Sequence, residues 1–299
     1  MSVLARPQGL PDRVWSLVAG LAALGGQCSR QDLEAIVNPG YLREGRKVQS
    51  KAELARDTLG AASSLGLLTY DRNEARLAEG LALSSAADLA DHIHDGLCRL
   101  QSGETNAVLL EGYAWVAAES DRSGGLGWIY ESTREEFADK ANQALISDDE
   151  DGRAMNTTKL LPWRRWLAFM GLGVSLPLAQ GTPDLPMPSS RIARELGRID
   201  FPRGVDVAAA DLLAVLAERM PYLDGGRLFA QACQRIEHPA PVRRLSPLTS
   251  AALRDLHDEG FLSMRPRGDA ADAARLSDDP SHLIQTFSTV VVRTAGGTT

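Results

Sequence analysis

SSLGLLTYDRNEARL, residues 63–77, is the stretch that decides the fold of the N-terminal region. Leu67-Leu68-Thr69-Tyr70 is an apolar segment of the kind found in strands, and Asp71-Arg72-Asn73 has the composition of a turn. Ala75-Arg76-Leu77 then returns as a second short segment. The pattern therefore predicts a short β-hairpin that follows a helix ending near Gly66.

Three short helices are predicted before this hairpin. Pro11 opens the first, and apolar residues then recur at helical spacing: Val14, Leu17, Val18, Leu21 and Leu24. Ser29 caps the second, which carries Leu33, Ile36 and Val37. A capping box of Ser50 and Glu53 opens the third, which is expected to bury Ala55, Thr58, Leu59, Ala62 and Leu65. Three helices followed by a hairpin over residues 10–80 resemble the winged-helix family.

The C-terminal region shows a related pattern. Ser246-Pro247 is an N-cap followed by a first-turn proline, and Gly260 ends the predicted helix before the strand Phe261–Met264. The segment HDEGFLSMRPRGDAADAARL, residues 257–276, is similar to residues 63–77, with Ala274-Arg275-Leu276 in the position of Ala75-Arg76-Leu77. Residues 283–292 are a further strand candidate. We therefore predict a second winged helix with an enlarged wing.

Together these patterns predict a mainly α chain with small β-hairpins, a winged helix at each end and a helical middle. The expected domains are residues 1–82, 83–188 and 189–299. The prolines at 177, 183, 186 and 188 make that stretch the best linker candidate.

Composition limits the possible functions. The net charge of −7 means that DNA contact requires a local basic patch, and the 5% aromatic content argues against a base-stacking RNA platform. The widely separated Cys28, Cys98 and Cys233 do not form a disulfide framework and fit a reducing cytoplasm. We expect a cytoplasmic protein, because the sequence shows no signal-peptide core and no uninterrupted apolar span.

One local basic patch is present around the third predicted helix. In helix-turn-helix relatives the corresponding helix enters the major groove. In this chain, Ser50 at the N-terminus of the helix offers backbone amides that could bind phosphate, and Arg72 lies at the predicted wing tip. The candidate residues for contact with double-stranded DNA are Arg43, Arg46, Lys47, Ser50, Lys51, Arg56 and Arg72. The alternative is an ordinary solvated helix face beside a basic loop, because winged helices also serve as protein adaptors.

The second module has a different charge pattern. Its third helix is expected to expose Arg254, Asp255, Asp258 and Glu259, a net negative face that favours protein docking or dimerisation over duplex binding. Two basic groups have open interpretations. Arg235, Arg243 and Arg244 are either a phosphate contact or ordinary loop charge. Arg191, Arg194, Arg198 and Arg203 either meet a nucleic acid or acidic partner, or pair with Glu195 and nearby carboxylates.

Catalytic and metal motifs are absent from the sequence. There is no phosphate-binding loop, no GxSxG elbow and no HExxH. His92, His94 and Cys98 are the one cluster of possible ligands, but His92 points to another side of a helix. We therefore expect no catalysis, cofactor or metal; a cryptic enzyme is the remaining third hypothesis.

The whole layout resembles a known family. WRRWLAFMGLG (residues 163–173) leads through the proline-rich stretch to PMPSSRIARELGRI (residues 186–199) between the two predicted winged helices. This arrangement is similar to the DpdG-type accessory proteins of bacterial 7-deazaguanine DNA modification and phage-defence clusters. The resemblance implies protein partners in a defence complex and a role in recognising DNA or assembling that complex. Alternatives are a protein scaffold without nucleic-acid affinity and a winged-helix transcriptional regulator. A homodimer fits any of these.

Overall fold

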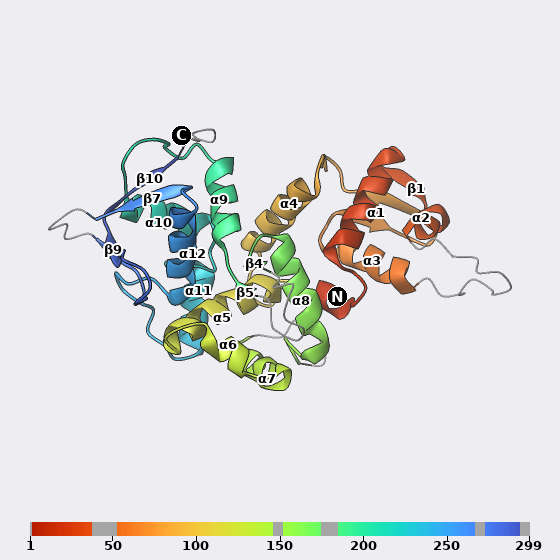
Figure 1. Ribbon diagram of the computed structural model, residues 1–299. Helices are drawn as coiled ribbons and strands as arrows, with labels where there is room; N and C mark the ends of the chain where they lie inside the picture. Colours follow the sequence, from red (N-terminus) through yellow and green to blue (C-terminus); the bar gives the residue numbers. More distant parts are fainter. Residues whose placement is uncertain (1, 38–52, 146–151, 175–184, 267–272, 294–299) are drawn as a thin grey trace. The chain divides into compact units, whose positions relative to one another are not determined.

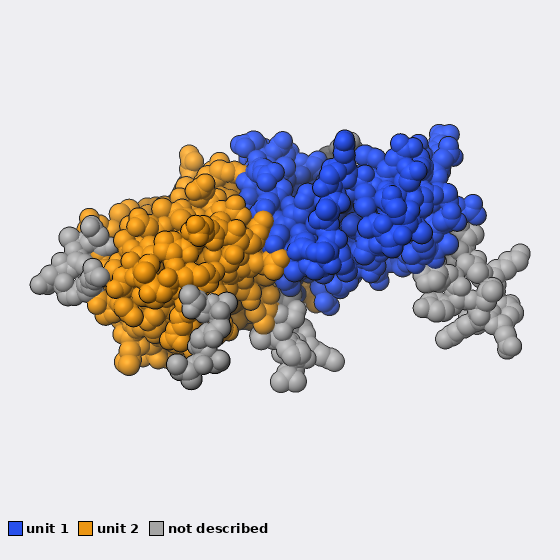
Figure 2. Space-filling model, turned by 90° about the horizontal axis from the view of Figure 1, so that it is seen from above, with its two compact units in different colours: residues 1–109, 146–170 blue, residues 110–145, 171–299 orange. Residues whose placement is uncertain are grey.

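The computed structural model describes residues 2–37, 53–145, 152–174, 185–266 and 273–293. These residues form a mainly α protein with small antiparallel strand pairs, which confirms the predicted fold class (Figure 1). The chain divides into two compact units, residues 1–109 with 146–170 and residues 110–145 with 171–299 (Figure 2). The three domains predicted from sequence remain a prediction. No helix within the described ranges is long and apolar enough to cross a membrane.

Unit 1 contains a three-stranded sheet packed with helices. Its elements are η1 (Val3–Ala5), α1 (Pro11–Ala23), β1 (Gln27–Ser29), α2 (Arg30–Val37), α3 (Glu53–Ser64), β2 (Leu68–Tyr70), β3 (Glu74–Leu77), α4 (Ala86–Arg99) and α8 (Thr157–Phe169). The strand order is β1-β3-β2, and both pairings are antiparallel. Leu17, Leu21, Leu33, Leu59 and Leu67 are fully buried at its centre. The helix and hairpin positions agree with the sequence pattern.

Unit 2 begins with helices from the middle of the chain and continues to the C-terminal region. In chain order it contains most of α5 (Val108–Arg122), α6 (Gly127–Glu131), α7 (Arg134–Ala144), β4 (Gly173–Val174), β5 (Leu185–Pro186), α9 (Ser189–Arg198), β6 (Val207–Ala208), α10 (Ala209–Arg219), α11 (Arg227–Arg235), α12 (Pro247–Asp258), β7 (Leu262–Arg265), β8 (Ala274–Arg275), β9 (Thr286–Phe287) and β10 (Thr289–Val292). Trp115 packs edge-on against Trp128 and Phe137, whose rings are stacked 5.6 Å apart. This aromatic cluster joins α5, α6 and α7.

Each unit contains a module with the same order of helices and strands. In each, a helix precedes a short strand, a second helix follows that strand directly, and a later helix leads into an antiparallel strand pair: α1-β1-α2-α3-β2-β3 and α9-β6-α10-α12-β7-β10. The sheet orders β1-β3-β2 and β6-β10-β7 correspond strand for strand. Unit 2 adds α11 before α12 and the β8–β9 pair before β10.

The strand that completes the second sheet differs from the prediction. Ala274 and Arg275 form β8, which pairs with β9, whereas β10 pairs with both β7 and β6. Placing Ala274-Arg275-Leu276 in the position of Ala75-Arg76-Leu77 was therefore wrong. The tripeptide repeat is short, and the burial of β10, from Thr289 to Val292, fits the central position better.

Helices α3 and α12 end with the same kind of glycine cap. Gly66 and Gly260 have φ values of 72° and 74°, a left-handed conformation that L side chains adopt at a cost. The amide after each glycine donates back to the helix, from Leu67 to the Ala62 carbonyl at 3.0 Å and from Phe261 to the Leu256 carbonyl at 2.9 Å. The shared cap directs each helix into its strand.

Replacement of Gly66 tests this cap. A Gly66→Ala variant is expected to lose about 1 kcal/mol of unfolding free energy, because alanine is disfavoured at positive φ. No atom lies within 4 Å of the added Cβ, so conformation alone is responsible. Gly66→Asn is the matched control, since asparagine tolerates this region better, and it should lose clearly less. Chemical denaturation measures both; equal losses would contradict the capping role.

Candidate functional site

Helix α3 is the centre of the candidate DNA contact. Its inner side buries Ala55, Thr58, Leu59 and Ala62, as predicted. The expected burial of Leu65 was wrong, because α3 ends at Ser64 and Leu65 is only partly buried just beyond it. The Thr58 hydroxyl donates to the Leu54 carbonyl at 2.7 Å, so its oxygen is satisfied within the helix. These residues fix which side of α3 is turned away from the core of the module.

Much of that outer side is covered by the chain's own N-terminal arm, residues 2–10. The Arg6 guanidinium lies over Gly60 and forms an ion pair with Asp57 at 3.8 Å. Gly9 lies so near Ala61 that an added Cβ would be 2.5 Å from the alanine Cβ. Asp57, Gly60 and Ala61 are therefore buried, and this face of α3 is not available to a DNA groove.

Two of the seven predicted contact residues are described, and both are exposed. Arg56 lies on α3 beside the covered face, and Arg72 lies in the turn between β2 and β3. The turn is held by Asp71, whose carboxylate accepts hydrogen bonds from the amides of Asn73 at 2.7 Å and Glu74 at 2.9 Å. These bonds lower the pKa of Asp71. The hairpin tip is thus ordered locally, with Arg72 facing solvent.

The other five predicted contacts, Arg43, Arg46, Lys47, Ser50 and Lys51, lie outside the described residues. The sequence still shows where the module's positive charge resides. Residues 2–37 and 53–77 hold six arginines and seven acidic residues, whereas residues 38–52 hold four basic residues and one acidic residue. The excess of positive charge in this module is therefore concentrated in the segment that precedes α3.

Other arginines of the first module form ion pairs within it. Arg30 pairs with Glu34 at 2.7 Å, and its guanidinium carbon lies 5.5 Å from the centre of the Tyr70 ring. Arg76 pairs with Glu74 at 2.6 Å. Arg30 was not among the predicted contacts. Its spacing of four residues from Glu34 is the sequence signal for a helical ion pair.

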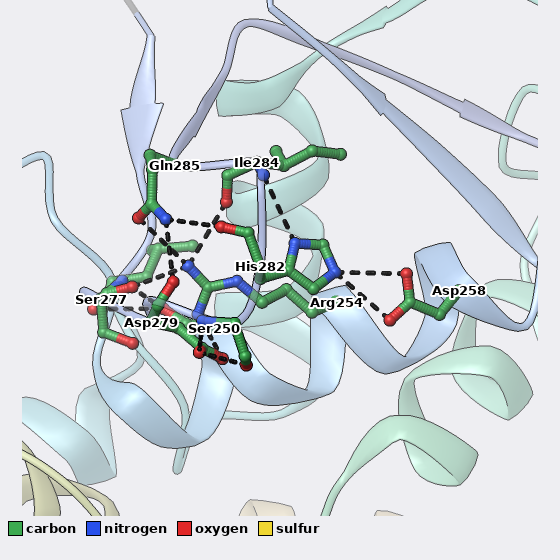
Figure 3. Close-up of polar contacts among 10 residues, drawn as sticks. Ser250, Arg254, Asp258, Ser277, Asp279, His282, Ile284 and Gln285 are labelled. Carbon is green, nitrogen blue, oxygen red and sulfur yellow. Dashed lines mark hydrogen bonds and ion pairs between the residues drawn. The ribbon is translucent and has the colours of Figure 1, made fainter.

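In the second module, Arg254 is buried rather than exposed, which corrects the sequence expectation. Figure 3 shows the polar contacts of its side chain. Its guanidinium donates to the Ser277 carbonyl at 2.7 Å and the Ile284 carbonyl at 3.3 Å, and lies 3.8 Å from an Asp279 oxygen. Burial lowers the pKa of Arg254, which Asp279 partly offsets. Because arginine remains charged in proteins, Arg254 acts as a fixed cation that binds the segment from Ser277 to Ile284.

The segment 277–285 consequently lies over α12. The Ser277 amide donates to Ser250 Oγ at 2.8 Å, and His282 Nε2 is 3.2 Å from both Asp258 oxygens (Figure 3). Asp258 and Glu259 are the exposed residues at the end of this helix. α12 is therefore covered by this segment and presents carboxylates to solvent, which is unfavourable for a DNA duplex.

The remaining basic groups of unit 2 largely serve internal ion pairs. Arg235 pairs with Glu111 at 3.2 Å and Arg244 with Asp121 at 2.7 Å. Glu195, which is fully buried, pairs with Arg191, with Arg198 at 2.8 Å and with Arg219 at 2.6 Å. For Arg191 and Arg198 this confirms the interpretation as partners of Glu195. Arg235 and Arg244 therefore do not support the interpretation as a phosphate contact, because each forms an ion pair within the protein.

The histidine and cysteine cluster does not converge on one point. His94 is buried with its Nε2 3.6 Å from Cys98 Sγ, while His92, two residues earlier on α4, is exposed. This agrees with the helical spacing of the two histidines. The three cysteines, all within the described residues, are free thiols.

A family model described as DpdG-like matches residues 1–270, which is most of the chain. No curated protein and no solved structure matches the chain.

Proposed function

We propose, because this chain belongs to the DpdG-like family, that it is a non-catalytic accessory protein of a bacterial DNA modification and phage-defence system. In this proposal it works in the cytoplasm through protein partners and a limited DNA contact. The three free thiols fit a reducing compartment. The observation that carries the proposal is the repeated module, with Arg56 and Arg72 exposed in unit 1 and a covered, acidic counterpart in unit 2.

Both repeats are proposed to be winged helices. The support is the order of helices and strands together with the β1-β3-β2 and β6-β10-β7 sheets, in which the hairpin occupies the position of a wing. In unit 2 the wing is enlarged by β8 and β9, and it folds back over α12. A helix covered in this way is suited to holding a module together rather than entering a groove.

The DNA contact is assigned to the first module. Arg56 and Arg72 are exposed on α3 and at the hairpin tip, and the basic segment before α3 contributes Arg43, Arg46, Lys47 and Lys51. Since the N-terminal arm covers Asp57, Gly60 and Ala61, the expected contact is with phosphates along the edge of the module. Such a contact gives affinity without strong sequence preference.

The non-catalytic assignment is supported by how the buried carboxylates of α5 are used. Glu111, Glu119 and Asp121 pair with Arg235, Arg122 and Arg244, the last two at 2.6 and 2.7 Å. The pairs of Glu111 and Asp121 connect α5 to Arg235 and Arg244, and the pair of Glu119 lies within α5, so all three carboxylates have cationic partners that give them a structural role. A pure scaffold is the second candidate, and the covered face of α3 is the specific observation that favours it.

Charge reversal tests the DNA contact. A triple variant Lys47→Glu, Lys51→Glu, Arg56→Glu is expected to weaken duplex binding and to lower the slope of log K against log salt by about 0.9 for each phosphate that is no longer neutralised. Fluorescence anisotropy with a labelled duplex over a range of NaCl concentrations measures this slope.

Two hairpin variants provide a matched comparison. Arg72→Glu in the first module should lower the salt slope by about one. Arg265→Glu changes the corresponding strand pair of the second module, where Arg265 pairs with Asp206 at 3.2 Å, and should leave the slope unchanged. If the triple variant binds DNA like the unmodified chain, the first module is not the contact and the scaffold assignment replaces it.

A further inference from the structure

The N-terminal arm is attached to unit 1 on both sides of the point where it crosses α3. Val3 and Leu4 are 0% and 3% exposed, and Gly9 lies against Ala61 of α3. Gln8, which lies between these two attachments, is exposed. A short exposed segment is therefore kept at a fixed place beside α3, where it can position the side chains that contact it.

Arg6 of this arm neutralises the carboxylate on the covered face of α3. Asp57 is 8% exposed, lies 3.8 Å from the Arg6 guanidinium, and accepts a hydrogen bond from the Gln8 amide at 3.4 Å. Arg56, the residue before Asp57 on α3, forms no ion pair with any residue that the structure describes. The arm thus supplies the cation that Asp57 requires, and the charge of Arg56 stays available to a ligand.

Arg13 is a further cation beside the arm, and it was not among the predicted contacts. Its Nη1 donates to the Gln8 carbonyl at 3.1 Å and also to the Gln8 side-chain oxygen, and both hydrogen bonds are exposed. Because the Gln8 amide donates to Asp57, Gln8 connects the first turn of α1 to α3 and brings Arg13 to the same edge of the module as Arg56. Both acceptors of Arg13 are neutral, so the guanidinium is oriented while its charge stays uncompensated.

The described arginines of the first module fall into two groups. Those that pair with a carboxylate are Arg6, Arg30 and Arg76. Those that form no ion pair with a described residue are Arg13, Arg56 and Arg72. Two exposed carboxylates, Asp12 and Glu53, lie on the first turns of α1 and α3 and pair with none of these arginines. They reduce the net charge of the edge, but they leave each of the three guanidinium groups free to meet a phosphate.

We propose that the N-terminal arm completes the DNA contact of the first module, with Arg13 as a ligand of a duplex phosphate and Arg6 as a positioning residue. Arg13 presents N–H groups to the phosphate, a pairing that guanidinium geometry favours. Gln8 orients this guanidinium before DNA arrives, so that little side-chain entropy is lost on binding. Arg6 acts through Asp57, whose charge would otherwise repel the same strand. This inference rests on the proposed DNA contact and adds α1 and the arm to it.

Duplex binding by the full chain, followed by anisotropy over a range of NaCl concentrations, tests the role of Arg13. Arg13→Gln is expected to lower the slope of log K against log salt by about 0.9, because one phosphate is no longer neutralised. Arg13→Lys keeps the charge and should keep the slope. Arg99→Gln is the matched control, since it removes an exposed cation at the end of α4, outside the first module, and should leave the slope unchanged.

The role of Arg6 is tested by rescue. Arg6→Ala is expected to raise the Kd for the duplex about threefold at low salt, because the uncompensated Asp57 charge repels nearby phosphates through water. Adding Asp57→Asn to the same chain removes that charge and should restore the Kd. A role of Arg6 in packing alone predicts no such recovery.

The outcomes separate this inference from the proposed function. If the triple variant at Lys47, Lys51 and Arg56 lowers the slope but Arg13→Gln does not, the DNA contact stands and the arm is not part of it. An equal loss of slope in Arg13→Lys and Arg13→Gln would also overturn the phosphate role, because only one of them lacks the charge. A double variant that binds as weakly as Arg6→Ala overturns the positioning role. An unmodified chain that does not bind a duplex overturns both the inference and the DNA contact.

Discussion

An Arg254→Ala variant is expected to lose about 3 kcal/mol of unfolding free energy, since hydrogen bonds from a buried charged group contribute roughly 1.5–3 kcal/mol each and are replaced by unsatisfied carbonyls. Arg254 is 5% exposed and donates to the carbonyls of Ser277 and Ile284. Alanine has no side-chain donor, so both carbonyls are deprived of their charged partner. The same change also releases Asp279 from its ion pair with Arg254.

The Arg254→Ala variant is expected to loosen the segment 277–285 even under conditions in which the rest of unit 2 stays folded. Without Arg254, the segment 277–285 loses its attachment to α12, and its amides should exchange with deuterium faster even where the rest of unit 2 is folded. Hydrogen exchange followed by mass spectrometry separates this effect from general destabilisation. Arg275→Ala is the control, because Arg275 forms an exposed pair with Asp278 and should change the unfolding free energy by less than about 0.5 kcal/mol. Protection of 277–285 that is unchanged in Arg254→Ala would show that this segment is held on α12 by other contacts.

Local signals in the sequence were sufficient to predict much of the fold. Pro11 marks the start of α1, Ser246-Pro247 marks the start of α12, and Gly66 separates α3 from the hairpin, as expected from capping and turn chemistry. These features depend on residues within a few positions of one another. The same is true of Arg191 and Glu195, whose pairing follows from one helical turn.

Long-range contacts were not predictable in this way. Arg254 lies on a helix with an acidic end, and nothing nearby indicates that carbonyls 23 and 30 residues away are its partners.

The covered face of α3 had a signal in the sequence. Gly60 and Ala61 leave room for close approach of another segment, as the contacts of Arg6 and Gly9 show. For the candidate DNA site, five of seven residues lie outside the described part of the chain, so those assignments remain predictions.

The largest loss is expected from Glu195→Ala. Glu195 is fully buried and joins Arg191 and Arg198 of α9 to Arg219 of α10. Breaking a buried ion pair by removing one partner typically costs about 3–5 kcal/mol, because the remaining charge is left in a poorly solvated site. Here the site retains Arg191, whose side chain has no solvent exposure, beside two further guanidinium groups. Thermal and urea unfolding of the full chain should show a shift assigned to unit 2.

Three comparison variants separate the origin of this loss. Glu218→Ala, at an exposed position on α10, should change the unfolding free energy by less than about 0.5 kcal/mol. Glu195→Gln keeps hydrogen-bonding groups but removes the charge, so a destabilisation close to that of Glu195→Ala identifies electrostatics as its main cause. The double variant Arg191→Met, Glu195→Leu removes the buried cation with its partner and should recover a large part of the stability, since Arg198 and Arg219 are partly exposed and can turn to water. A double variant as unstable as Glu195→Ala would mean that the lost link from Glu195 to Arg198 and Arg219, and not the charge left on Arg191, sets the cost.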